Sequence, residues 1–138
     1  MKKLFSILMA SLVLAVSFSA SAQSPVSITP SKTTLTNSDT AYAVKSFPVP
    51  VDKITLQAVL NKTSGTIAGT VLPQGSLDGT NYVNISTDTL TLANQSVNTK
   101  IWTFDKRQYY YYRLRFNTTG TSVAVPVAYI LTSAPPSK

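Results

Sequence analysis

The sequence Tyr109-Tyr110-Tyr111-Tyr112-Arg113-Leu114-Arg115-Phe116 is the stretch that decides the fold class. Side chains alternate between two faces in a β-strand, so this stretch divides into two unlike surfaces. The apolar surface carries Tyr110, Tyr112, Leu114 and Phe116, and the aromatic and cationic surface carries Tyr109, Tyr111, Arg113 and Arg115. Such alternation predicts a half-buried strand and not a helix.

Other segments show the same alternation and are separated by turn-forming residues. They are residues 40–47, 53–60, 66–72, 89–92, 100–104 and 121–131. The polar run 61–65 predicts a turn that joins residues 53–60 and 66–72 in a hairpin. Trp102 and Phe104 share one face of their segment, which indicates a core position for the tryptophan.

No window shows sustained helical periodicity, and turn signals recur every eight to twelve residues or so. This pattern predicts an all-β chain that forms a single antiparallel β-sandwich of jelly-roll, immunoglobulin-like or discoidin-like type, with about seven to eight strands. Pro48 and Pro50 indicate that residues 40–47 lie at an edge or crossover, and Pro126 predicts an edge or a bulge in the last strand.

The N-terminus has the three parts of a secretory signal peptide. Lys2 and Lys3 precede an apolar stretch, and Ala20-Ser21-Ala22 is a small-residue cleavage site before Gln23. We therefore expect a signal peptide over 1–22, a Ser/Thr/Pro-rich arm or irregular first strand over 23–40, a β-sandwich domain over 41–132 and a loose tail over 133–138. The expected location is outside the first membrane, in the periplasm, at the cell surface or in the medium. No later segment is long and apolar enough to span a bilayer.

The composition excludes several kinds of chemistry. The 138 residues include no histidine, no cysteine and no glutamate, and the net charge is +7. A Ser-His-Asp or Cys-His nucleophile, a His general base and a His or Cys zinc site are therefore impossible within the chain. The five carboxylates are Asp39, Asp52, Asp78, Asp88 and Asp105, each beside turn-forming or basic residues. We expect no enzyme activity, no cofactor and no metal site.

The segment 74–85 is the most distinctive local motif. Asp78-Gly79 favours a turn, because glycine accepts positive φ and the aspartate accepts hydrogen bonds from nearby amides. A calcium site at Asp78 and Asn81 is the alternative, but calcium takes six to eight oxygen ligands or so and usually several carboxylates. The plain structural turn at Asp78 and Gly79 is the favoured interpretation.

Residues 53–131 resemble a known group of proteins. The motifs are Ser64-Gly65-Thr66, Gly69-Thr70, the run from Gln74 to Tyr82, Lys100-Ile101-Trp102, Tyr111-Tyr112-Arg113-Leu114 and Gly120. They resemble β-sandwich proteins of tailed phages, of tail, fibre or decoration type, and related exported bacterial proteins. The resemblance implies a structural or surface-interaction role and brings no catalytic residue.

Two functions follow as hypotheses. The first is a non-enzymatic exported module that binds an envelope, glycan or protein partner through Tyr109, Tyr111, Arg113 and Arg115, which can stack on sugar rings or contact anionic groups. The second is a phage-like structural or decoration subunit that self-associates through sheet edges, and then belongs in a virion. Basic residues are spread along the chain, so we expect no nucleic-acid partner.

Overall fold

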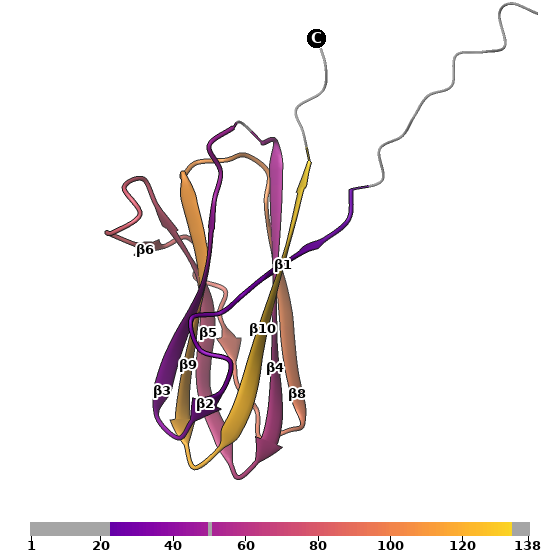
Figure 1. Ribbon diagram of the computed structural model, residues 1–138, viewed down its shortest axis with the longest axis vertical. Coiled ribbons are helices and arrows are strands. Elements are labelled where there is room, and N and C mark those ends of the chain that lie inside the picture. Colours follow the sequence, from indigo (N-terminus) through magenta and orange to yellow (C-terminus); the bar gives the residue numbers. More distant parts are fainter. Residues whose placement is uncertain (1–22, 50, 134–138) are drawn as a thin grey trace, which may run out of the picture.

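The computed structural model describes residues 23–49 and 51–133. The predicted signal peptide and most of the predicted tail lie outside these residues. Two antiparallel sheets pack face to face (Figure 1). The first, here called the β4 sheet, has the order β1 (Val26–Ile28), β10 (Val123–Ser133), β4 (Lys53–Ser64) and β8 (Val97–Phe104), with β2 (Leu35–Thr36) also paired to β10. The second, the β9 sheet, has the order β3 (Asp39–Ser46), β9 (Tyr111–Gly120), β5 (Ile67–Ser76) and β6 (Val83–Asn84), with β7 (Leu90–Thr91) also paired to β5.

The predicted all-β sandwich is confirmed, and the described part of the chain forms ten strands in place of seven to eight. The additional strands are short: β1 has three residues, and β2, β6 and β7 have two each. β7 lies within the predicted segment 89–92, whereas alternation cannot be recognised over the two or three residues of β1, β2 and β6. No helix that could cross a membrane occurs in the described part of the chain.

The N-terminal segment 23–40 contributes β1 and β2 to the β4 sheet, and its last two residues begin β3 of the β9 sheet. Ile28 pairs with Ala128, and Leu35 pairs with Ala124. Both Ile28 and Leu35 are buried, so they anchor the segment against the core.

The core lies between the sheets and is built from the inward residues of each strand. Tyr112, Leu114 and Phe116 of β9 are at most 1% exposed. They face apolar side chains from both sheets, including Ala41, Ala43, Ile54, Leu56, Leu60, Ile67, Val71, Ala128 and Ile130. Trp102 is also buried, as predicted, and its Nε1 donates a hydrogen bond to the Asp88 carbonyl oxygen at 2.6 Å.

The predicted hairpin between residues 53–60 and 66–72 is wrong, because β4 and β5 belong to different sheets. The turn after Ser64 carries the chain across the sandwich. Gly65 has φ +71°, and a Cβ there would lie 2.0 Å from the Thr121 carbonyl oxygen. The β9-to-β10 connection, which also crosses between the sheets, therefore packs directly on this glycine. Only glycine fits so close a backbone approach.

The prolines inside strands mark gaps in pairing. Pro126 pairs with Leu60 of β4, but on its other side it lies between the residues that pair with β1 and those that pair with β2. Pro73 of β5 likewise lies between the residues that pair with β7 and those that pair with β6. Proline has no N–H to donate, so a gap in the ladder is where it fits. The edge position predicted for residues 40–47 is confirmed, since β3 ends the β9 sheet.

Asp78 organises the turn between β5 and β6. Its carboxylate accepts hydrogen bonds from the amides of Thr80 and Asn81, each at 2.8 Å, and from the side chains of Asn81 and Ser76. The Gly79 amide in turn donates to Ser76 Oγ. These donors, above all the Asn81 amide, hold the pKa of Asp78 well below its usual range. The turn is thus the structural one predicted from Asp78 and Gly79.

Leu114→Ala is expected to lower the free energy of unfolding by about 2–5 kcal/mol, because it opens a cavity at a fully buried position. Urea unfolding followed by circular dichroism measures the loss. Ile101→Ala is the control, since Ile101 is 57% exposed on the outer face of the β4 sheet. Equal losses in the two variants would contradict the described core.

Asp78→Ala is expected to reduce the acid sensitivity of the fold. The pKa of Asp78 is lower in the folded state, so its contribution to stability is complete above the ordinary pKa and is lost as the pH falls through the folded value. The unfolding temperature of the wild type should fall from about pH 4 to about pH 2, and that of Asp78→Ala should fall less. The hydrogen bond from Lys32 also lowers the pKa of Asp39, and this second contribution to acid sensitivity is present in both proteins. Asp52→Ala, at an exposed position, is the control. Parallel curves for wild type and Asp78→Ala would contradict this role.

Candidate functional site

β9 places three of the four predicted binding residues on one surface. Tyr111, Arg113 and Arg115 lie half-buried on the outer face of the β9 sheet, while the residues between them point into the core. β9 pairs with β3 on one side and with β5 on the other. This pairing keeps successive side chains of β9 on opposite faces of the sheet. The division into two faces is therefore confirmed for residues 111–116.

Tyr109 and Tyr110 do not follow that alternation, because β9 begins only at Tyr111. Tyr110, expected on the apolar surface, is 49% exposed, and the Arg107 guanidinium lies 4.7 Å from its ring centroid. Tyr109 turns toward the core instead of joining Tyr111. Its ring packs edge-on against Tyr112 at 5.9 Å between centroids, at one end of the sandwich.

Arg113 is the centre of the outer surface. Its guanidinium carbon lies 4.3 Å from the ring centroid of Tyr42 on β3 and 3.7 Å from that of Tyr82 in the β5–β6 hairpin. Its Nε donates to Gln74 Oε1 at 2.7 Å, and Gln74 Nε2 donates to Asn84 Oδ1 at 2.8 Å. Guanidinium groups stack readily on tyrosine faces, so Arg113 holds the two rings beside β9.

Tyr111 extends this surface over the Asp78 turn. A Cβ added at Gly79 would lie 3.1 Å from Tyr111 Cζ, so the tyrosine ring rests on the glycine. The β5–β6 hairpin that carries Tyr82 projects from the side of the sandwich (Figure 1). We call the combined surface of Tyr42, Tyr82, Tyr111, Arg113 and Arg115 the tyrosine–arginine face.

Arg115 is the other cation of this face. In the register it lies between Tyr42 on β3 and Leu72 on β5. Its Nε is buried and has no hydrogen-bond partner among the described residues. A buried guanidinium N–H without an acceptor costs free energy. The terminal nitrogens of Arg115, which form no ion pair with a described residue, are the donors left for an acceptor from outside the chain.

The face is positive because no carboxylate among residues 23–49 and 51–133 pairs with either arginine. The ion pairs among the described residues are Lys32–Asp39, Lys53–Asp105 and Lys100–Asp88. Asp78 is the carboxylate beside the face, and its oxygens accept the hydrogen bonds of their own turn. Burial lowers the pKa of Arg113, but a guanidinium stays charged at neutral pH. Burial also raises the pKa of Tyr82, which keeps that phenol protonated.

Sequence reasoning missed Tyr42, Gln74 and Tyr82. The alternation of residues 40–47 put Tyr42 opposite Ala41 and Ala43, but it could not show that β3 pairs with β9. Tyr82 lies in the 74–85 motif. That motif predicted a turn, but it could not show that the turn places Tyr82 beside Arg113. Within the described residues, no three acidic, His or Cys side chains gather as metal ligands.

Comparison with known proteins adds a fold likeness. No family model matches the chain, and no curated protein sequence matches it. A solved structure described as Family 16 Carbohydrate Binding Module-2 is similar with a TM-score of 0.43 and 16% sequence identity, over 67% of this chain and 70% of that chain. A likeness at this level does not assign a function. The resemblance to tailed-phage structural proteins stays a prediction.

Proposed function

We propose that this chain is an exported, non-enzymatic β-sandwich module that binds an acidic glycan through the tyrosine–arginine face. The observation that carries the proposal is the arrangement of two guanidinium groups among three tyrosine rings on one sheet face, where neither guanidinium pairs with a carboxylate of the described chain. From the sequence we expected a glycan, envelope or protein partner. The proposal specifies one chemical class among these, an acidic glycan.

The two side-chain types suit the two parts of an acidic sugar. Guanidinium groups form bidentate, charge-assisted hydrogen bonds with carboxylates, and those bonds are stronger than neutral ones. Tyrosine rings offer flat apolar surface to the C–H faces of sugar rings, together with a hydroxyl for hydrogen bonding. A face with both can hold an extended polyanionic chain.

The two arginines have different parts in this proposal. Arg113 is enclosed by Tyr42 and Tyr82 and donates to Gln74, so it positions the aromatic rings. Arg115 forms no ion pair with a described residue, so its terminal guanidinium nitrogens are the anchor for the ligand carboxylate. The rings and Arg113 are held by packing before a ligand arrives, which lowers the entropic cost of binding.

Arg115→Gln is expected to weaken binding to polygalacturonate about tenfold or more, because it removes the anchoring charge and its paired donors. Isothermal titration calorimetry measures the affinity, and binding should weaken as salt is added. Lys62→Gln is the matched control, since it removes the same charge from an end of β4 where Lys62 Nζ donates to Asn94. Arg115→Lys should recover part of the loss, because lysine restores the charge without the planar fork.

Neutral dextran should not bind detectably. The proposal is wrong if polygalacturonate does not bind, if dextran binds equally well, or if Arg115→Gln and Lys62→Gln have the same effect. Circular dichroism of each variant shows whether the sandwich is intact.

Self-association is the second candidate function, and one observation favours it. In the described part of the chain, β8 pairs only with β4 and so forms the end of its sheet over eight residues. Its outward residues Val97, Thr99, Ile101 and Thr103 are uncharged and exposed. Free edges of this kind accept a strand from another copy.

Light scattering should then give a molar mass that rises with protein concentration. At the same concentration, the Ile101→Lys variant should have a lower molar mass than the wild type. A monomer at every concentration would contradict self-association.

A further inference from the structure

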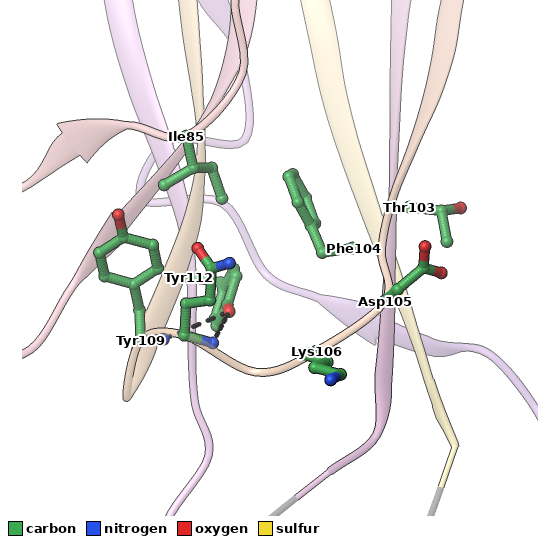
Figure 2. Close-up of a pocket in the computed structure, with 8 residues that line it drawn as sticks. Ile85, Thr103, Phe104, Asp105, Lys106, Tyr109 and Tyr112 are labelled. Atoms are coloured by element: carbon green, nitrogen blue, oxygen red, sulfur yellow. Dashed lines mark hydrogen bonds between the residues drawn. The ribbon is translucent and has the colours of Figure 1, made fainter.

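The end of the sandwich near Phe104 and Tyr112 holds a pocket that the proposed function does not use. Its volume is about 420 Å³. Tyr109 and Ile85 lie on one side, Phe104 and Thr103 lie on the other, and Tyr112 lies between them (Figure 2). The pocket is distinct from the tyrosine–arginine face, because none of the five residues of that face lines it.

Three aromatic rings form the wall of the pocket. The ring centroid of Tyr112 lies 6.0 Å from that of Phe104 and 5.9 Å from that of Tyr109. Phe104 comes from the last residue of β8, and Tyr109 precedes β9, so the two sheets each contribute one side. Polar and charged residues make up the other part of the lining, and the volume is in the usual range of small-ligand sites.

Tyr112 adds a hydroxyl group to the aromatic part of the pocket lining. The residue is 1% exposed, and its hydroxyl oxygen accepts hydrogen bonds from the backbone amides of Gln108 at 3.0 Å and Tyr109 at 3.3 Å. A phenol has one proton to donate in addition to the lone pairs that accept. Both amides use the lone pairs, and no described residue accepts the proton. The O–H proton therefore has no acceptor among the described residues, and Tyr112 is one of the residues that line the pocket.

The rim adds both donors and acceptors. Asp105 provides a carboxylate, Gln108 an amide and Lys106 an ammonium. Asp105 is exposed, and its contact with Lys53 is 3.5 Å at a solvated position, so its oxygens remain accessible. A ligand that fits this site has two apolar faces that pack against the aromatic rings. It also has hydroxyl groups around its edge that form hydrogen bonds with the polar residues of the rim.

We propose that this pocket is a second binding site, which takes a single neutral sugar ring. A pyranose has two C–H faces, which pack against Phe104 and Tyr109, and hydroxyl groups around its edge, which meet Asp105 and Gln108. One of its oxygens accepts the Tyr112 proton. The inference does not rest on the acidic-glycan proposal, because its ligand carries no charge and its residues are different.

Nuclear magnetic resonance of the 15N-labelled protein tests the pocket directly. The amides of Gln108 and Tyr109 donate to the Tyr112 hydroxyl, so their signals report what that hydroxyl binds. Titration with D-galactose, D-glucose and N-acetyl-D-glucosamine, each to tens of millimolar, should give a saturable shift of both signals with at least one sugar, at the millimolar affinity usual for a small polar ligand.

Variants at the exposed rim separate binding from stability. Gln108→Ala should weaken the sugar affinity severalfold, and Gln108→Trp should abolish it by filling the mouth of the pocket, while the backbone amide of residue 108 remains. Gln95→Ala, in an exposed loop before β8, and Arg115→Gln should both leave the affinity unchanged. Tyr112→Phe, if it folds, should also lose the response.

Three results would overturn the inference. They are the absence of a saturable shift at residues 108 and 109 with all three sugars, a shift confined to residues of the tyrosine–arginine face, and a response that Gln108→Trp leaves intact. A sugar response that persists in Arg115→Gln while polygalacturonate binding is lost would show that the two sites are independent. Failure of the acidic-glycan proposal would leave this test unaffected.

Discussion

The pairing of β9 on both sides is the constraint on which the structure depends. β3 and β5 fix its register, and that register sends Tyr112, Leu114 and Phe116 into the core while Tyr111, Arg113 and Arg115 remain outside. A shift of one residue would exchange the two sets and bury guanidinium groups among apolar side chains, at a large cost. The stability of the sandwich and the composition of its outer face are therefore set by the same pairing.

The two sheets have different surfaces. The β9 sheet carries the tyrosine–arginine face, in which Arg113 stacks between Tyr42 and Tyr82. On the outer face of the β4 sheet, β8 exposes uncharged residues such as Ile101. The first surface attracts an anionic ligand by charge, whereas the outward residues of β8 are uncharged and do not repel a second copy. The proposed functions use separate parts of one small domain.

The start of β9 connects the face with the end pocket. Residues 109 and 110 precede the strand, so the run of four tyrosines does not make one surface. Tyr109 lines the end pocket, Tyr110 stacks under Arg107, Tyr111 covers the Asp78 turn, and Tyr112 closes the core. A strand boundary within four identical residues thus gives them four environments.

The sequence by itself determined the all-β class, the alternation of residues 111–116, the Asp78-Gly79 turn and the burial of Trp102, because each depends on local geometry or on the period of two within a strand. It could not determine which strands are neighbours. Most strands pair with partners far along the chain, such as β10 with β4 and β9 with β3, and the β4-to-β5 turn crosses between sheets although it resembles a hairpin. Only the tertiary structure brought Tyr42, Gln74 and Tyr82 to Arg113 and formed the pocket around Tyr112, since both depend on contacts between segments that local sequence does not specify.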